Sequence, residues 1–295
     1  ITNASDHSRD FPSKVTEIRV DVDAESGSIS VYNDGPGIPI AMHSEHKCYI
    51  PELIFANFRT GTNYDDSAKR MKGGLNGLGS KIVGTFSTSF TVDTVSGGQK
   101  YVQTYENNLS KINKPLITKC KKKEGTRITF FPDLARFGID KMSEHLVKVF
   151  EKRTLDIAAC TEKTVNVFFN GVKFSVKDFE SYLELYCGPK KDTKRVIIDT
   201  PRWKVAFFLN PFDKFTQFSF VNGLCTTNGG SHVNHVIQPV IKKVVEQLSA
   251  KHKDIEIRPN YVKDNLLVFV FSLIENPEFK SQSKEELVSK VNDFG

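Results

Sequence analysis

The chain has 295 residues, of which 39% are hydrophobic and 26% are charged, a composition typical of a soluble globular protein with room for two ordinary domains. No apolar run approaches the ~18 residues that a membrane-spanning helix needs. No signal peptide opens the sequence, which begins at Ile1 without Met. The net charge of +6 permits a polyanionic partner but does not require one.

The cysteines are scattered, without CxxC pairs or the spacing of a metal site, and this odd, dispersed set indicates reduced, buried thiols in an intracellular protein. His43, His46 and Cys48 lie close enough in the sequence to suggest zinc. Because no fourth ligand is nearby, a polar loop is the better interpretation of that segment. The five cysteines are Cys48, Cys120, Cys160, Cys187 and Cys225.

The first part of the chain predicts a sheet combined with several helices. Residues 18–23 and 28–32 alternate apolar and polar side chains on either side of Gly27, which predicts a β-hairpin that runs into Asn33. Further strands and helices follow from the same kinds of pattern. We expect strands at 90–95, 100–105 and 126–131, a second hairpin of 165–169 and 172–176 around Asn170-Gly171, and helices at 51–58, 81–86 and 140–159.

The pattern changes after about residue 176. Two strands are expected at 204–209 and 217–221, followed by a long amphipathic helix at 233–250 and a strongly apolar strand at 266–274. A strand–helix–strand unit with its own apolar residues predicts a second domain.

Two glycine-rich segments, Asn33 to Pro39 and Gly73 to Lys81, are the most informative part of the sequence. The first lets the backbone approach a flat ligand, and the side chains of Asn33 and Asp34 can bond the edge of a base. The second presents backbone N–H groups, then a lysine, and opens a helix, which suits phosphate. Neither segment is a GxxxxGK[ST] loop or a GxGxxG turn after a strand. Together they predict a nucleotide pocket with two walls.

These segments resemble the adenine-binding DxGxG turn and the phosphate-binding lid of the GHKL ATPases, with Asn33 in place of the usual Asp. The similarity to the ATPase region of eukaryotic-type type IIA DNA topoisomerases runs nearly end to end. It implies an α+β fold, with a GHKL (Bergerat) α/β sandwich at 1–176 that lacks its amino-terminal part. A ribosomal-S5-like transducer domain at 177–295 would lack its carboxy-terminal part. The other matching segments are Asn3-Ala4-Ser5-Asp6, Thr60 to Asp66, Phe220-Val221-Asn222, Gly229-Gly230-Ser231-His232, Glu275-Asn276-Pro277 and Gln282-Ser283-Lys284.

At the adenine end, the resemblance implies that Asn33 reads the base through a water that Thr126 shares, while Ile38 lies beneath the base. An Asn amide offers both a donor and an acceptor, which suits adenine. Asn3 matches the Asn that coordinates Mg²⁺ in the family, and a hard oxygen ligand is chemically right for that ion. Asp6 would face the same side of a helix as Asn3. An isolated Asn is usually an ordinary surface residue, so the magnesium role rests on the resemblance.

At the phosphate end, the resemblance implies a cradle for ATP. Thr62 and Asn63 match the family's ribose-contacting residues, although the family usually carries Ser-Ser-Asn, so one hydroxyl is lost. Leu75 and Pro36 stand where the family has Arg and Lys, so affinity and lid dynamics do not carry over. Lys81 either touches a phosphate or lies at the surface. The implied cradle consists of Gly74, Asn76, Gly77, Leu78 and Gly79.

Gln282 and Lys284 lie in a Gln-Ser-Lys segment similar to the family's Gln-Thr-Lys loop, which reaches the γ-phosphate. A fixed cation there would stabilise the charge that develops during phosphoryl transfer. The alternative is that 284–290 is simply a charged helix. The family's general base, a Glu four residues before the Asn matched by Asn3, would precede Ile1, so no residue of this chain matches it.

The lysine run at 119–123 suggests a nucleic-acid or import patch, but a solvated loop between strands is the better interpretation. Lys251 and Lys253 lie where the resemblance implies a DNA-contacting loop of the transducer domain. It also implies ATP and Mg²⁺ as cofactors, and double-stranded DNA and a second copy of the chain as partners. The implied location is the nucleus, or a cytoplasmic replication site for a viral protein.

The resemblance therefore predicts the ATP-binding and hydrolysing N-terminal gate of a type IIA DNA topoisomerase, which dimerises on ATP to capture a DNA segment. Three alternatives stay open. A mismatch-repair clamp or a chaperone would share the pocket, but the segments around Asn222, His232 and Lys284 argue against both. A non-hydrolysing ATP-operated DNA clamp would lack the general base. A basic DNA-binding module with a decayed pocket is disfavoured by the intact glycines.

Overall fold

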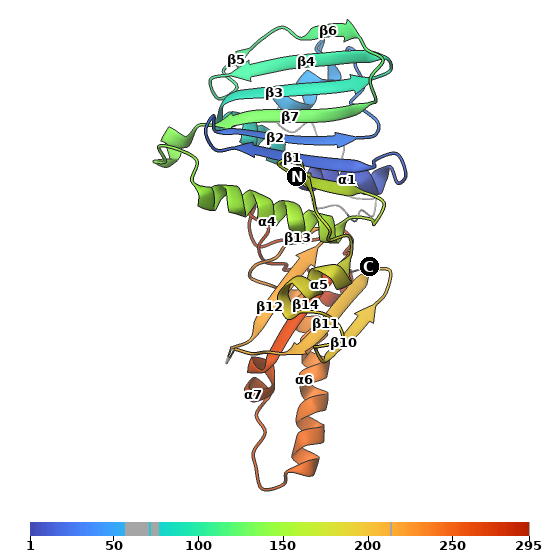
Figure 1. Cartoon of the computed structure of the whole chain (residues 1–295), viewed down its shortest axis with the longest axis vertical. Coiled ribbons are helices and arrows are strands. Elements are labelled where there is room, and N and C mark those ends of the chain that lie inside the picture. The colour runs from blue at the N-terminus through green and yellow to red at the C-terminus, as the bar shows by residue number, and fades with distance from the viewer. Residues whose placement is uncertain (57–70, 72–76, 213, 295) are drawn as a thin grey trace. The chain divides into compact units, whose positions relative to one another are not determined.

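The computed structural model describes residues 1–56, 71, 77–212 and 214–294. These residues form two compact units, of which the first reaches Asp178 and the second begins at Phe179 (Figure 1). None of the helices in the described ranges is long and apolar enough to cross a membrane. Each unit has its own sheet and its own apolar core.

The first unit is built on a sheet in which nine strands are described. Across the sheet their order is β5-β4-β3-β7-β2-β1-β8-β9, and β6 pairs with β4 along the same edge as β5 (Figure 1). Every pair is antiparallel except β1 with β8. The strands are β1 (Glu17–Asp23), β2 (Ser28–Asp34), β3 (Ser87–Ser96), β4 (Gln99–Glu106), β5 (Lys111–Ile112), β6 (Leu116–Lys119), β7 (Gly125–Pro132), β8 (Asn166–Phe169) and β9 (Val172–Lys173).

The alternation of side chains gives this sheet a closed face and an open face. The closed face carries Ile18, Val20 and Val22 of β1, which are buried, and the open face carries Arg19 and Asp21, which are not. All four α-helices described in this unit pack on the closed face through apolar clusters. One polar face is usual for an antiparallel sheet. The helices are α1 (Thr2–Asp10), α2 (Ile50–Ala56), α3 (Gly79–Thr85) and α4 (Glu144–Cys160).

The predicted hairpins, strands and helices of this unit are present close to their predicted positions, with two informative differences. Helix α4 begins later than the predicted 140, because the Ser143 side chain caps it by accepting a hydrogen bond from the backbone N–H of Leu146. Asn33 and Asp34 lie inside β2 rather than in the turn after it, because β2 stays paired with β7 through both residues.

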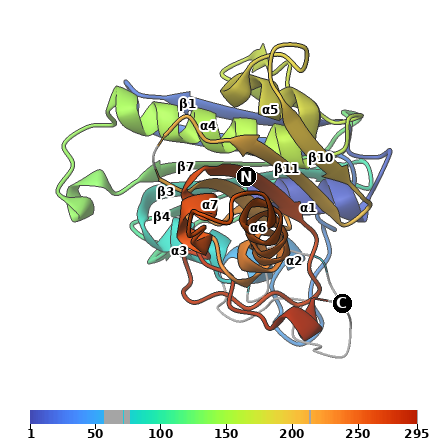
Figure 2. The same cartoon turned by 90° about the horizontal axis from the view of Figure 1, so that it is seen from below.

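The second unit contains a sheet with the order β10-β11-β14-β12-β13 among its described strands. Strands β12 and β14 are parallel neighbours, and the chain passes from one to the other through α6, the long helix seen nearly end-on in Figure 2. The strands are β10 (Arg195–Asp199), β11 (Trp203–Leu209), β12 (Thr216–Val221), β13 (Leu224–Cys225) and β14 (Leu266–Ser272). The helices are α5 (Phe179–Cys187), α6 (Ser231–Lys251) and α7 (Pro259–Asp264).

Strand β14 divides its apolar side chains between two helices. Val268 and Val270 belong to the cluster that α6 covers. On the other face, the rings of Phe269 and Phe271 lie 6.4 and 5.5 Å from the ring of Tyr182 in α5. A strand that is buried on both faces appears as a continuous apolar run. This explains why the strand could be predicted from composition alone.

Candidate functional site

Three polar side chains lie next to one another on the closed face of the first unit. Asn33 in β2 is directly opposite Thr126 in β7, and Thr126 is directly opposite Thr94 in β3. The hydroxyls of Thr94 and Thr126 are 2.9 Å apart. Residues that are directly opposite in antiparallel strands project from the same face. The sheet therefore brings Asn33 and Thr126 together in one polar row, as the adenine end of the predicted pocket requires.

Thr94 was not predicted from the sequence, yet it organises the hydrogen bonds at this position. It is fully buried, and its hydroxyl accepts a hydrogen bond of 3.0 Å from the backbone N–H of Ile38. The same hydroxyl donates to the carbonyl of Gly125 at 3.1 Å. Ile38 is thereby held beside the polar row, and its side chain packs against the apolar cluster that includes Phe90.

Two glycines of the first segment occupy positions that admit no side chain. A Cβ on Gly37 would lie 2.0 Å from the carbonyl oxygen of Val95 and 3.0 Å from the hydroxyl of Thr94. Gly35 has a φ of +96°, and a Cβ there would lie 2.5 Å from a methyl group of Val15. The glycines thus allow the backbone of this segment to lie directly against β3.

Asp34 does not contribute to the polar row, which corrects the expectation that its side chain bonds a base. It points to the open face, where it is fully buried and accepts hydrogen bonds from the backbone N–H groups of Thr16 and Glu17 at 2.7 and 2.8 Å. Lys123 and the hydroxyl of Thr16 also donate to it. Burial by itself would raise the pKa of Asp34, but these hydrogen bonds outweigh burial and lower it below 3.8. These contacts hold the end of β2 in place, and the Asp34 carboxylate is not directed toward the candidate nucleotide site.

Helix α1 carries the two residues proposed for the magnesium end. Asn3 is exposed, whereas Asp6 is buried and forms an ion pair with Arg9 at 3.2 Å. His7, which was not predicted, donates a hydrogen bond of 3.1 Å to the carbonyl of Pro36. This bond ties α1 to the glycine-rich segment, so Asn3 belongs to a helix that is anchored beside the candidate site.

Part of the predicted phosphate lid can be located. Gly77 has a left-handed backbone, with a φ of +58°, and Leu78 and Gly79 lead into α3. Lys81 is almost fully buried in that helix, so the alternative that it lies at the surface is wrong. Burial lowers the pKa of its ammonium group. The predicted contacts Thr62, Asn63, Gly74 and Asn76 lie outside the described residues.

Gln282 and Lys284 lie at the tip of a loop in the second unit, and the predicted alternative of a charged helix at 284–290 is wrong. The loop is closed below its tip by backbone hydrogen bonds between residues 278–280 and 286–288. Lys284 has a left-handed backbone with a φ of +60°, which is uncommon for a residue with a side chain. Gln282 is exposed and Lys284 is half-buried.

The turn at Gly229 and Gly230 anchors this loop. The backbone N–H of Asn228 donates to the carbonyl of Glu285 at 2.9 Å, directly after Lys284. Gly230 forms a β-bridge with Leu287, whose backbone atoms would lie 2.3–2.6 Å from a Cβ on that glycine. Gly229 and Gly230 belong to a segment that resembles the family. Their structural role is to set the position of the segment that bears Lys284.

The remaining predicted residues of the second unit lie elsewhere. Lys251 ends α6 and Lys253 follows it, and both side chains are exposed. His232 is fully buried near the start of α6 within 3.1 Å of the Thr226 hydroxyl, and burial lowers its pKa to about 3. His232 is therefore a neutral structural residue at ordinary pH.

The histidines and cysteines are also possible metal ligands. No group of three or more potential ligands that could hold a metal ion occurs in the described part of the chain. His43 and His46 contact one another, with ring centroids 4.9 Å apart. The five cysteines are half-buried, so the expectation that they are buried is wrong.

Comparison with known proteins agrees with this arrangement. Residues 1–136 match the family model of the histidine kinase-, DNA gyrase B-, and HSP90-like ATPases, and residues 157–293 match the DNA gyrase B model. The solved ATPase region of Saccharomyces cerevisiae topoisomerase II is 40% identical and has a TM-score of 0.92, over 100% of this chain and 76% of that one. The ATPase and transducer domains of Balamuthia mandrillaris DNA topoisomerase II are 36% identical, with a TM-score of 0.93 and the same coverage.

The fold and the site thus define a GHKL-type ATPase domain followed by a transducer domain, which confirms the predicted fold class. The chain belongs to the type II DNA topoisomerase family and corresponds to its ATPase region. DNA topoisomerase 2 of Candida albicans is 41% identical over all of this chain, which covers 22% of that protein. The chain spans about a fifth of the length of the curated relatives that it matches.

Proposed function

We propose that this chain binds ATP on the closed face of its first unit and serves as the hydrolysing, ATP-operated gate of a type II DNA topoisomerase. The observation that supports this most directly is the polar row of Asn33, Thr126 and Thr94 in a chain of that family. An amide and two hydroxyls offer the donors and acceptors that a base edge requires. Gly37, which has no side chain, brings the backbone of the glycine-rich segment directly against β3 beside them.

Mg²⁺ is the proposed second cofactor, with Asn3 as its protein ligand. Asn3 fits this role chemically because its amide oxygen is a hard ligand on an exposed side chain of an anchored helix. Mg²⁺ commonly takes few protein ligands and completes its coordination with water and substrate phosphates. When bound, the ion would neutralise phosphate charge. The chain's own contribution is to hold the amide of Asn3 at the start of α1.

Lys284 is the proposed link between the nucleotide and the second unit. Its loop is held by the Gly229–Gly230 turn, so the ammonium group is carried by a fixed segment rather than by a free coil. A cation positioned in advance stabilises negative charge that develops in a transition state. We propose that it contacts the γ-phosphate, and that ATP drives two copies of the chain together around duplex DNA, with Lys251 and Lys253 among the DNA contacts.

Ligand-induced stabilisation tests the nucleotide site. Mg²⁺ with a non-hydrolysable ATP analogue is expected to raise the melting temperature of the chain, because a ligand that binds only the folded state stabilises it. Asn33→Ala is expected to abolish that rise and to leave the melting temperature without ligand nearly unchanged. Asn292→Ala, at an exposed position of the second unit, is the control. A full ligand shift in Asn33→Ala would remove Asn33 from the site.

Steady-state hydrolysis by the full-length enzyme tests Lys284. Lys284→Ala is expected to lower kcat by on the order of 10², as is typical for the loss of a transition-state donor, with little change in ADP affinity. Lys280→Ala is the matched control from the same loop, because its side chain is exposed and pairs with Glu286 at the surface. Normal turnover in Lys284→Ala would show that this lysine has no catalytic contact.

A further inference from the structure

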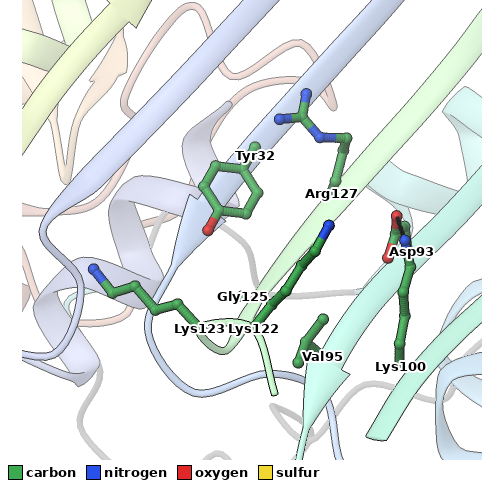
Figure 3. A pocket seen from close by; sticks show the side chains of 8 residues that line it. All are labelled: Tyr32, Asp93, Val95, Lys100, Lys122, Lys123, Gly125 and Arg127. Carbon is green, nitrogen blue, oxygen red and sulfur yellow. Dashed lines mark ion pairs between the residues drawn. The ribbon is translucent and has the colours of Figure 1, made fainter. Parts of the chain in front are cut away.

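The lysine run at 119–123, which the proposed function leaves unused, borders a pocket of about 350 Å³. Lys119 ends β6, and residues 120–123 lie in the loop between β6 and β7, as the interpretation of a loop between strands expects. The pocket opens on the open face of the first unit's sheet, and we call it the open-face pocket (Figure 3). Its lining contains one acid, Asp93, and four cations, Lys100, Lys122, Lys123 and Arg127.

The open-face pocket is separate from the nucleotide site, although the same strands form both. Tyr32, Arg127 and Asp93 are directly opposite one another on β2, β7 and β3. Each is next in sequence to a member of the polar row, and neighbouring residues of a strand point to opposite faces. The sheet itself therefore lies between the two sites, and a change in one side chain can be tested without touching the other.

The shape of the pocket depends on Gly125. A Cβ at this position would lie 2.9 Å from a ring carbon and 2.9 Å from the hydroxyl oxygen of Tyr32, so the absence of a side chain allows the tyrosine to lie over the strand. The guanidinium of Arg127 lies 5.0 Å from the centre of that ring. It also donates a hydrogen bond of 2.7 Å to Ser30, which fixes its orientation. The result is a wall in which an aromatic ring and a planar cation lie side by side.

The charges around the pocket are not balanced. Lys100 pairs with Asp93 at 2.9 Å, Lys123 pairs with the buried Asp34, and Arg127 pairs with Asp21 outside the pocket at 3.4 Å. Lys122 is exposed and forms no ion pair within the described part of the chain, and its ammonium group points toward Arg127 (Figure 3). Two cations that face one space repel each other unless an anion lies between them. The exposed Lys119 and Lys121 extend the positive charge beyond the pocket.

We propose that the open-face pocket binds the phosphodiester backbone of duplex DNA, with Lys122 and Arg127 as phosphate contacts. This inference rests on the proposed function, because it assumes that duplex DNA is the partner. A continuous polyanion fits the surface better than a single small anion, because Lys119 at the end of β6 and Lys121 in the following loop lie outside the pocket. Lysines and arginines that contact phosphates position a duplex without reading its sequence. The site is therefore expected to bind DNA of any sequence.

Fluorescence anisotropy with a labelled duplex, measured on the 295-residue chain between about 50 and 200 mM salt, tests the proposal. Lys122→Ala is expected to weaken binding by on the order of three- to tenfold and to reduce the slope of log K against log salt by about 0.9, the value for one lost phosphate contact. Lys122→Glu is expected to weaken binding further. Lys141→Ala removes an exposed lysine after the opposite end of β7 and is expected to leave affinity unchanged.

The outcomes separate this proposal from the proposed function. If the unmodified chain does not bind duplex DNA, both the DNA partner and the open-face site fail. If Lys251→Ala and Lys253→Ala weaken binding while Lys122→Glu does not, DNA remains the partner and the open-face site is overturned. If Lys122→Glu abolishes binding of inorganic tripolyphosphate but not of DNA, the pocket is a small-anion site and the proposal is wrong. The ATP-analogue shift in every variant shows that the fold is intact.

Discussion

The closed and open faces of the first unit's sheet use the same strands for different purposes. On the closed face, Asn33, Thr94 and Thr126 form a polar row among apolar side chains that four helices cover. On the open face, the adjacent residues Tyr32 and Arg127 border a basic pocket. A polar group on the closed face must find its hydrogen bonds within the protein, whereas one on the open face can use water. The same substitution should therefore lower the free energy of unfolding more on the closed face than on the open face.

The largest effect is expected at Gly37, where the closed face admits no Cβ. Gly37→Ala would place that atom 2.0 Å from the carbonyl of Val95, so the segment must move away from β3. We expect the free energy of unfolding to fall by about 3 kcal/mol, as for a strongly overpacked site, and the stabilisation by the ATP analogue to disappear. Urea unfolding and thermal melting measure both.

Gly79→Ala is the matched control for Gly37→Ala, because a Cβ on Gly79 meets no atom of the described residues within 4 Å and the residue begins α3. Its free energy of unfolding is expected to stay the same or to rise slightly. Equal losses in the two variants would show that the close approach of Gly37 to β3 does not decide the stability of the segment.

The sequence was sufficient for most of the regular elements because their signals are local. Alternation identified the hairpin of β1 and β2, and helical spacing identified α4 and α6. The edge strands β5 and β6 were missed because they are two and four residues long and largely exposed, so they show no apolar alternation. The charged segment at 284–290 has the composition of a helix, but its backbone bonds go to neighbouring segments instead.

The site was less predictable, because pairing across the sheet determines it. Asn33 and Thr126 were found through resemblance, but nothing in the sequence around Thr94 distinguishes it from any other strand threonine. Only the register of β3 against β7 shows that it faces Thr126. Asp34 was misassigned because it is adjacent to Asn33, although the alternation of a strand turns its side chain to the other face. Knowing that β2 continues through Asp34 would have been enough to correct this.

A smaller loss of stability is expected when a threonine of β3 is replaced by valine, and this substitution can be made on either face of the strand. Thr94→Val removes a hydroxyl that serves the N–H of Ile38, the carbonyl of Gly125 and the hydroxyl of Thr126. The substitution leaves these polar groups without a hydrogen-bond partner in the protein interior. We therefore expect a loss of about 1–3 kcal/mol in the free energy of unfolding. Binding of the ATP analogue, measured by calorimetry, should weaken as well.

Thr91→Val is the control for Thr94→Val, because Thr91 lies in the same strand on the open face and its hydroxyl bonds the hydroxyl of Thr104 at 2.9 Å. Water can replace that bond, so its loss should cost less than about 0.5 kcal/mol. If the two valine variants lose equal free energy of unfolding, the face on which a threonine lies does not determine how much its hydroxyl contributes to stability.

Apart from the control variants, the smallest effect is expected at Asp34, whose carboxylate is buried although it belongs to the open face. Its pKa is lower in the folded chain than the usual 3.8, so its contribution to stability is present above that value and is lost as the pH falls through the folded pKa. Asp34→Asn keeps an acceptor for the N–H groups of Thr16 and Glu17 but loses the charge that Lys123 pairs with. We expect a loss of about 1 kcal/mol at neutral pH and a weaker decline on acidification than in the unmodified chain. Urea unfolding at a series of pH values down to 3 measures both, and parallel declines in the two proteins would show that the pairing of Asp34 does not contribute to acid sensitivity.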